Sequence, residues 1–262
     1  MENNEILRPE RDIKVELYHD HFQNYKRYNI PKAQLVIADI PYNLDKNAYA
    51  SNPSWYIDGD NSNGESDKAG KAFFDTDKDF RFAEFMHFCS TLLKKEPKET
   101  GKAPCMIVFC AFEQIPMVID YGLKYGFKGN IPLFFIKNYS GQVLKANMRV
   151  VGATEFAILL YREKLPKFNN LGKMVFDWFL WQRDTTTPKI HPTQKPINVL
   201  KELIEIFTDR GDVVIDPVAG SGTTLRASAE LGRSAYGFEI KKDFFNKAKQ
   251  IMLKDIQTSL PF

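Results

Sequence analysis

The feature that most constrains the fold is an apolar run followed by an acid, a proline and two closely spaced glycines. Residues 213–215 are β-branched and predict a buried strand. Asp216-Pro217 ends that strand, because proline has no N–H for a ladder. Gly220 and Gly222 then permit a tight turn whose backbone stays open to a ligand. The pattern predicts a strand, a turn and the start of a helix.

Such a turn presents backbone N–H groups at a helix N-terminus, where a polar ligand is stabilised. Ser221, Thr223 and Thr224 are candidate caps for this helix, which we expect to run to Leu231. A triphosphate loop needs lysine where Thr223 stands, and a dinucleotide fingerprint needs glycine where Leu225 stands. Both sites are disfavoured, and a purely structural turn is the alternative.

The next expected strand, residues 234–239, favours a ligand. It ends in Glu239, about twenty residues after the turn, where a carboxylate can bind ribose hydroxyls. Asp-Pro-x-x-Gly-x-Gly-Thr-Thr followed by Gly-x-Glu resembles the S-adenosylmethionine (SAM) pocket of DNA amino-methyltransferases. The resemblance implies SAM as the cofactor. The residues it assigns to the cofactor here are Asp216, Pro217, Ala219, Gly220, Ser221, Gly222, Thr223, Thr224 and Glu239.

A second apolar run, residues 34–38, leads into Asp39-Ile40-Pro41-Tyr42. This resembles the Asp/Asn/Ser-Pro-Pro-Tyr/Phe catalytic motif of the same family. An exocyclic amine conjugated to its ring is a poor nucleophile, and two acceptors on its N–H groups direct its lone pair toward the methyl group. The resemblance assigns these acceptors to the Asp39 side chain and the Ile40 carbonyl, and it stacks Tyr42 on an extruded base. The alternative is a strand-ending turn over a packed tyrosine.

Residues 191–196 read His-Pro-Thr-Gln-Lys-Pro and closely resemble a third family element, which lies beside the methionine moiety of the cofactor. The resemblance adds His191 to the cofactor site. It lets Lys195 pair with the cofactor carboxylate, and Thr193 or Gln194 hydrogen-bond to it. Asp20, after the first expected strand, is assigned to the cofactor adenine because related enzymes place an acid there.

The order of these motifs is that of the β group of the family. It implies an α/β, Rossmann-like SAM-dependent methyltransferase fold: a mostly parallel seven-stranded sheet with helices on both faces and ligands at the carboxyl ends of the strands. We expect one catalytic domain over residues 1–262, with a polar, lid-like or disordered insert at 44–79. Further strands are expected at 14–18, 106–110, 133–136 and 155–161, and further helices at 80–95, 112–125 and 197–208.

Positive charge collects between residues 137 and 195, where ten Lys/Arg face four Asp/Glu, a local +6 in a chain of net +3. Segments 137–150 and 163–190 are therefore candidate target-recognition segments, and the second mixes bases with aromatic residues as a nucleic-acid groove does. A solvated face, or a hydrophobic cluster beneath a loop, is the alternative. The DNA-binding candidates are Lys137, Lys145, Arg149, Lys173, Arg183 and Lys189.

Several classes of protein are disfavoured by composition. No apolar run is long enough for a membrane span, and the polar N-terminus is no signal peptide. The three cysteines and four histidines have unrelated spacings, so we expect no disulfide framework and no metal site. A cytoplasmic location follows as an expectation.

We predict methylation of the N6 amine of adenine in double-stranded DNA, because Asp39 at the catalytic position favours adenine, whereas serine is commoner in the cytosine-N4 enzymes. Cytosine-N4 methylation is the first alternative. A catalytically weak nucleic-acid-binding protein that retains SAM is the second, since Ile40 replaces the family's proline. The candidate partners besides DNA are a cognate restriction endonuclease and a second copy of the chain.

Overall fold

The structure is a computed structural model that describes residues 13–42, 80–140, 146–170, 172–191 and 193–259. The expected insert at 44–79 and the candidate Lys145 lie outside this range. Within it, no helix combines the length and the apolar character that crossing a membrane requires.

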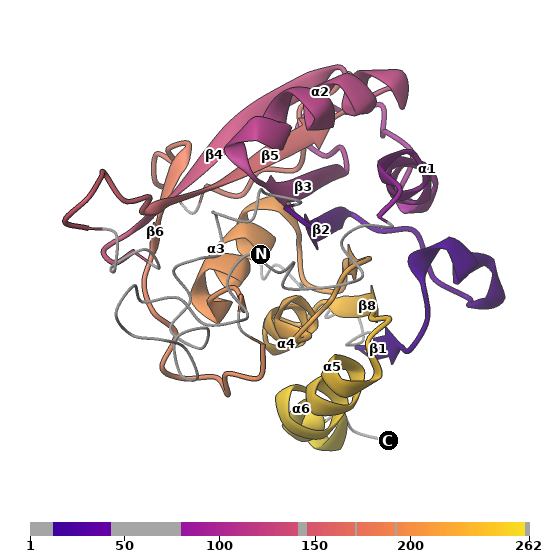
Figure 1. Cartoon of the computed structure of the whole chain (residues 1–262). Helices are drawn as coiled ribbons and strands as arrows, with labels where there is room; N and C mark the ends of the chain where they lie inside the picture. Colours follow the sequence, from indigo (N-terminus) through magenta and orange to yellow (C-terminus); the bar gives the residue numbers. More distant parts are fainter. Residues whose placement is uncertain (1–12, 43–79, 141–145, 171, 192, 260–262) are drawn as a thin grey trace, which may run out of the picture.

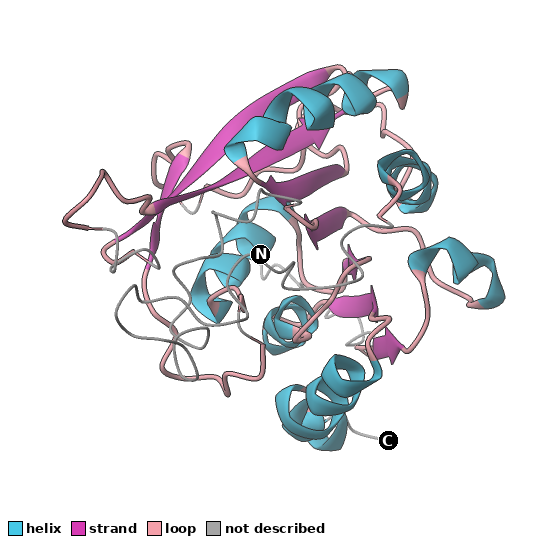
Figure 2. Ribbon diagram, viewed as in Figure 1, coloured by secondary structure: helices cyan, strands magenta, loops and turns pink. Residues whose placement is uncertain are grey.

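The described residues form one twisted sheet of eight strands in the order β1-β8-β7-β2-β3-β5-β4-β6 (Figures 1 and 2). Neighbouring strands are parallel except where β5 pairs with β3 and β4, so β5 alone runs against the others. The strands are β1 (Val15–Tyr18), β2 (Leu35–Asp39), β3 (Cys105–Cys110), β4 (Gly129–Lys137), β5 (Thr154–Tyr161), β6 (Trp178–Trp181), β7 (Val213–Asp216) and β8 (Ser234–Phe238).

Helices cover both faces of the sheet, which is why its central strands are continuously apolar. Successive side chains of a strand point to opposite faces. Val36 and Ala38 accordingly share a core with α1 (Phe82–Leu92) and α2 (Ile115–Lys124), whereas Leu35 and Ile37 share the other core with α3 (Ile197–Phe207). Along that second face, a smaller cluster joins β1 and β8 to the last helices. Those helices are α4 (Thr223–Glu230), α5 (Lys242–Lys247), the π-helical turn η6 (Ala248–Met252) and α6 (Lys254–Ser259).

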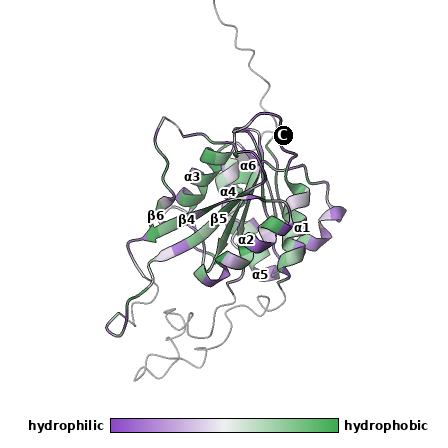
Figure 3. Ribbon diagram, turned by 90° about the horizontal axis from the view of Figure 1, so that it is seen from above, coloured by the Kyte–Doolittle hydropathy of each residue, from purple (hydrophilic) through white to green (hydrophobic). Residues whose placement is uncertain are grey.

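The family fold expected from the sequence is confirmed, and every expected strand and helix is present. The expected helix at 112–125 begins as the 3₁₀ turn η4 (Phe112–Gln114) before α2. The sheet has one strand more than expected, β6, within a segment predicted to be irregular. Phe179 and Trp181 of β6 join the α3-side core while Trp178 and Leu180 stay exposed. Figure 3 colours residues by hydropathy and shows that much of β4, the neighbour of β6, and of β5 beyond it is hydrophobic.

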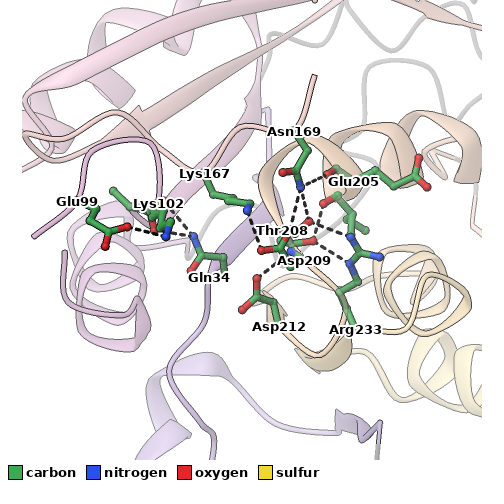
Figure 4. A network of polar contacts seen from close by, with 12 residues as sticks. Gln34, Glu99, Lys102, Lys167, Asn169, Glu205, Thr208, Asp209, Asp212 and Arg233 are labelled. Atoms are coloured by element: carbon green, nitrogen blue, oxygen red, sulfur yellow. Dashed lines mark hydrogen bonds and ion pairs between the residues drawn. The ribbon is translucent and has the colours of Figure 1, made fainter. Parts of the chain in front are cut away.

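A polar network fixes the C-terminal end of α3, where helical carbonyls lack helical partners (Figure 4). The Asn169 amide donates to the carbonyls of Glu205 and Thr208, each at 3.0 Å. Arg233 donates through Nη2 to the Thr208 carbonyl at 2.9 Å and through Nε to its hydroxyl at 3.0 Å. The loop before Ile197 lies at the other end of α3 and lines the pocket described below.

Candidate active site

A pocket of about 1130 Å³ opens at the carboxyl ends of the parallel strands, and it gathers motifs that lie far apart in the sequence. Parallel strands end at the same edge, so residues that follow β2, β7 and β8 converge there. The predicted site residues that line it are Asp39, Ile40, Pro41, Tyr42, His191, Thr193, Gln194, Lys195, Asp216, Pro217, Ala219, Gly220, Ser221, Thr223, Thr224 and Glu239, with Lys137, Arg183 and Lys189.

The glycine turn has the backbone conformation that its sequence predicts. Gly220 and Gly222 have φ values of +50° and +74°, in the left-handed region that L side chains rarely adopt. A Cβ added at Gly220 would meet nothing closer than the His191 ring at 3.8 Å, so the space above the turn is open. At Gly222 a Cβ would instead lie 3.4 Å from Ala248, on the side of the C-terminal helices.

The predicted caps of α4 are wrong. The N-cap residue is Gly222, and no side chain makes the capping hydrogen bond. The Ser221 and Thr223 hydroxyls lie 2.7 Å apart and bond to each other, while the Thr224 side chain hydrogen-bonds to Asp216. A left-handed glycine at the N-cap leaves the neighbouring hydroxyls free to organise the strand–helix junction instead.

Two buried acids frame the turn. The Asp216 carboxylate accepts the Val218 N–H at 3.1 Å, and burial, together with the nearby acids, raises its pKa to about 7. The Glu239 carboxylate accepts the N–H groups of Gly220 at 2.9 Å and Lys241 at 2.7 Å, while burial raises its pKa. Glu239 therefore ties the end of β8 to the glycine turn.

Asp39, the last residue of β2, lines the pocket. Its Oδ2 lies 2.5 Å from Lys195 Nζ. Its Oδ1 is buried and has no hydrogen-bond partner among the described residues. A buried acceptor without a donor is costly, so Oδ1 is suited to receive a donor from a ligand.

Ile40 replaces the family's proline without loss of backbone anchoring. Its N–H donates to the Phe109 carbonyl at 3.2 Å and extends the β2–β3 ladder by one bond, which a proline nitrogen cannot do. The Gln114 amide donates to the Pro41 carbonyl at 2.9 Å, so η4 holds the next residue. The backbone just after Asp39 is thus held in place by the hydrogen bonds of Ile40 and Pro41.

Tyr42 belongs to a charged network that sequence reasoning missed. Its hydroxyl donates to Glu155 Oε2 at 2.9 Å, and Glu155 Oε1 forms an ion pair with Lys137. Burial alone would raise the pKa of Glu155, but Lys195 and Lys137 outweigh it and hold that pKa below its ordinary value. Glu155 reaches this edge because β5 runs against its neighbours, an orientation that an apolar run does not reveal.

The structure separates the predicted DNA-binding residues. The Lys137 side chain is only 16% exposed and pairs with Glu155 inside the pocket, and its contact with DNA stays a prediction. Arg183 and Lys189 line the pocket, and the Arg183 guanidinium lies 4.5 Å from the centre of the Tyr139 ring. Arg149 is exposed in the β4–β5 connection. Lys173 lies apart from these, in a turn with Asn170 near the far end of α3.

The His-Pro-Thr-Gln-Lys-Pro loop is held largely by its own side chains. His191 Nδ1 accepts the Thr193 N–H at 3.3 Å. The Gln194 side chain donates to the Pro188 carbonyl at 3.0 Å and accepts the Ile190 N–H at 3.1 Å. Burial and the nearby lysines lower the pKa of His191 to about 4, so its ring is neutral at physiological pH. Gln194 therefore shapes the loop, whatever further contact it makes with a ligand.

Asp20, assigned to the cofactor adenine, is engaged within its own turn. Its carboxylate accepts the His21 N–H at 2.7 Å, the Asn24 amide at 2.6 Å and the Tyr28 hydroxyl at 2.8 Å. Asp20 does not line the pocket formed by the described residues, whereas His21 and Phe22 do. The structure thus brings the neighbours of Asp20 to the pocket, and the hydrogen bonds of Asp20 stabilise the turn that carries them.

Lys137→Met should lower the free energy of unfolding at pH 7 by about 3 kcal/mol, because one partner of a buried pair is removed. The pKa of Glu155 is lowered in the folded protein, so its stabilisation is present above its unfolded pKa and is lost as the pH falls. The variant raises this pKa, and its deficit should therefore shrink in acid.

Urea unfolding at neutral pH and near about pH 5 measures this difference. Lys128→Met is the matched control, because its pair with Glu163 is exposed at the surface, and it should leave stability almost unchanged. An equal deficit at both pH values would show that the loss comes from packing.

Comparison with known proteins agrees with this geometry. A family model described as DNA methylase matches residues 33–250. The DNA adenine methyltransferase YhdJ of Escherichia coli K12 is 26% identical over 254 residues, 89% of this chain and 80% of YhdJ. The type II methyltransferase M.HindIII of Haemophilus influenzae is 47% identical over 58 residues. This match spans 22% of this chain and only 19% of M.HindIII.

Solved structures share the fold. M1.HpyAVI in complex with SAM superposes with a TM-score of 0.65 at 23% identity, over 90% of this chain and 98% of that one. The cytosine-N4-specific PvuII DNA methyltransferase has a TM-score of 0.65 at 14% identity, over 94% of this chain and 90% of that one. The family match spans most of the chain, and the chain belongs to the N6/N4 DNA methylase family.

Proposed function

We propose that this protein transfers the methyl group of SAM to the N6 amine of adenine in double-stranded DNA. The observation that carries the proposal is the buried Oδ1 of Asp39, which has no hydrogen-bond partner among the described residues and belongs to a residue that shares one pocket with the glycine turn after β7. An acceptor beside a cofactor turn is what methylation of an amine requires.

The pocket fits SAM. The space above Gly220 is open, and the buried carboxylate of Glu239 lies at the end of β8, where ribose hydroxyls are bound in related folds. SAM supplies an electrophilic methyl group. The backbone of the turn and Glu239 would hold it, and M1.HpyAVI, which shares the fold, is known in complex with SAM.

The residues after β2 activate the amine. Asp39 Oδ1 and the Ile40 carbonyl accept its two N–H bonds, which turns the nitrogen lone pair toward the methyl group. Tyr42 stacks on the extruded base, and its hydrogen bond to Glu155 fixes the ring. Adenine is favoured by an acid at position 39 and by YhdJ, a relative named for adenine. Cytosine-N4 is the second candidate, because the same acceptors serve it and the PvuII enzyme shares the fold.

DNA is the proposed partner, with Arg183 and Lys189 at the pocket and Arg149 on the β4–β5 connection as its phosphate contacts. The proposal includes a single catalytic domain and a cytoplasmic location, which the three buried free thiols suit. A cognate endonuclease, a homodimer and a role in recognition for Lys145 and Lys173 stay predictions.

Asp39→Ala should slow methyl transfer by a factor of at least ~100, because one preorganised contact to the amine is lost. Asp39→Asn is the matched control: it keeps an acceptor oxygen and should retain more of the rate. Single-turnover reactions with labelled SAM and plasmid DNA, digested to nucleosides, give the rate and identify the base. N4-methylcytosine would favour the second candidate, and an Asp39→Ala rate within about threefold of the wild type would place the chemistry elsewhere.

Gly220→Val should abolish most SAM binding, because a β-branched residue is strained at a φ of +50° and its side chain enters the open space above the turn. Calorimetry with SAM measures the loss, and circular dichroism checks the fold. Gly126→Val is the control, since Gly126 has a φ of +86° and open space around its Cβ position, at the end of α2. Equal SAM affinity in both variants would remove the turn from the cofactor site.

Charge reversal of Arg149, Arg183 and Lys189 to Glu should weaken DNA binding and flatten its dependence on salt, because fewer phosphates are neutralised. SAM affinity should change little. Lys128→Glu is the control, since Lys128 is exposed and lies outside both candidate recognition segments. Binding measured by fluorescence anisotropy at several salt concentrations decides between a phosphate-binding surface and a solvated one.

A further inference from the structure

The ammonium group of Lys195 lies with the catalytic motif, although the sequence assigned it to the cofactor carboxylate. We propose that Lys195 is a positioning residue for Asp39: its ion pair occupies Oδ2 and leaves Oδ1 to accept the target amine. This inference rests on the proposed function. It changes the part played by the lysine in the His-Pro-Thr-Gln-Lys-Pro loop.

The surroundings of Lys195 hold the ammonium at this place. Its side chain is only 10% exposed, and Nζ lies 2.5 Å from Asp39 Oδ2. Three rings surround it, with centres 5.1 Å away for Phe109, 5.5 Å for Trp181 and 5.6 Å for Tyr42. Ring faces attract a cation, and a buried cation needs an anionic partner. If the Lys195 ammonium moved to another carboxylate, it would lose both the contacts with the three rings and the ion pair with Asp39.

The charges around Asp39 explain why a cation is needed there. Burial and the nearby Glu155 hold the pKa of Asp39 above its ordinary value, and Lys195 is the strongest influence that lowers it. Asp216 of β7 and Cys110 of β3 also interact electrostatically with Asp39. Lys137, a second lysine that lines the pocket, is already paired with Glu155. Lys195 is therefore the cation that opposes protonation of Asp39 among neighbouring acids.

Ionisation matters because the two states of a carboxyl group differ as acceptors. A carboxylate offers both oxygens, whereas a protonated carboxyl has a donor on one of them and accepts weakly on the other. With Lys195 on Oδ2, a single oxygen remains, and its direction is set by the ion pair. The lysine thus fixes both the charge state and the orientation of the acceptor.

Two variants test this role. Lys195→Met removes the charge, so more Asp39 is protonated at neutral pH; the methylation rate should fall about tenfold or more and recover as the pH rises. Lys195→Arg keeps the charge, so its pH profile should match the wild type. Its rate should stay below the wild-type rate, because a guanidinium can bind both oxygens of Asp39. Both variants should bind SAM within about threefold of the wild type by calorimetry.

Two further measurements keep the inference testable. The carboxyl resonance of Asp39, followed by NMR in protein without DNA or SAM, should titrate at higher pH in Lys195→Met than in the wild type. Adding Lys195→Met to Asp39→Asn should cost little further rate, because the lysine acts through Asp39. This double variant also removes both charges of the pair, so it guards against misfolding from an unpaired acid.

The outcomes separate the two proposals. A large loss of SAM affinity in Lys195→Met with an unshifted Asp39 titration would return Lys195 to the cofactor and overturn the inference. An unchanged pH profile and titration would overturn it as well. If the wild-type protein methylates neither base, the proposed function fails, and the NMR titration alone then decides whether Lys195 controls Asp39.

Discussion

The parallel pairing of β2 with both β7 and β3 is the constraint on which the site depends. Val36 lies in register with Met106 on one side and Ile215 on the other. Because this register is fixed by buried side chains on both faces, the three strands end within a few residues of one another at one edge of the sheet. Asp39 and Asp216 therefore meet in one pocket although 177 positions separate them in the sequence.

The second constraint is charge balance in a largely enclosed space. On one side of the pocket two acids, Asp39 and Glu155, are matched by two lysines, Lys195 and Lys137. Each buried charge is tolerated because it has a partner. The rings of Tyr42 and Trp181 lie beside Lys195 and add an attraction for its charge.

The sequence predicts the parts of the site that follow single strands. Apolar runs locate β2, β7 and β8. Asp39, Gly220 and Glu239 can then be predicted as site residues, because each lies at or just after the end of one of these runs. Glu155 and the pairing of Lys137 could not be predicted, since both depend on the reversed direction of β5. The run Trp178–Trp181 conceals its own alternation, because the exposed and the buried residues of β6 are equally apolar.

The hydrogen bond from Ile40 to Phe109 indicates that the second position of the family motif requires a particular backbone conformation more than a particular residue type. A prolyl ring restricts this backbone conformation through its fixed φ, whereas this chain restricts it through an additional backbone hydrogen bond to β3. The two devices are not interchangeable in one protein: proline at position 40 would leave the Phe109 carbonyl without this donor. Motif searches that demand both prolines would overlook chains that solve the same geometric problem by strand pairing.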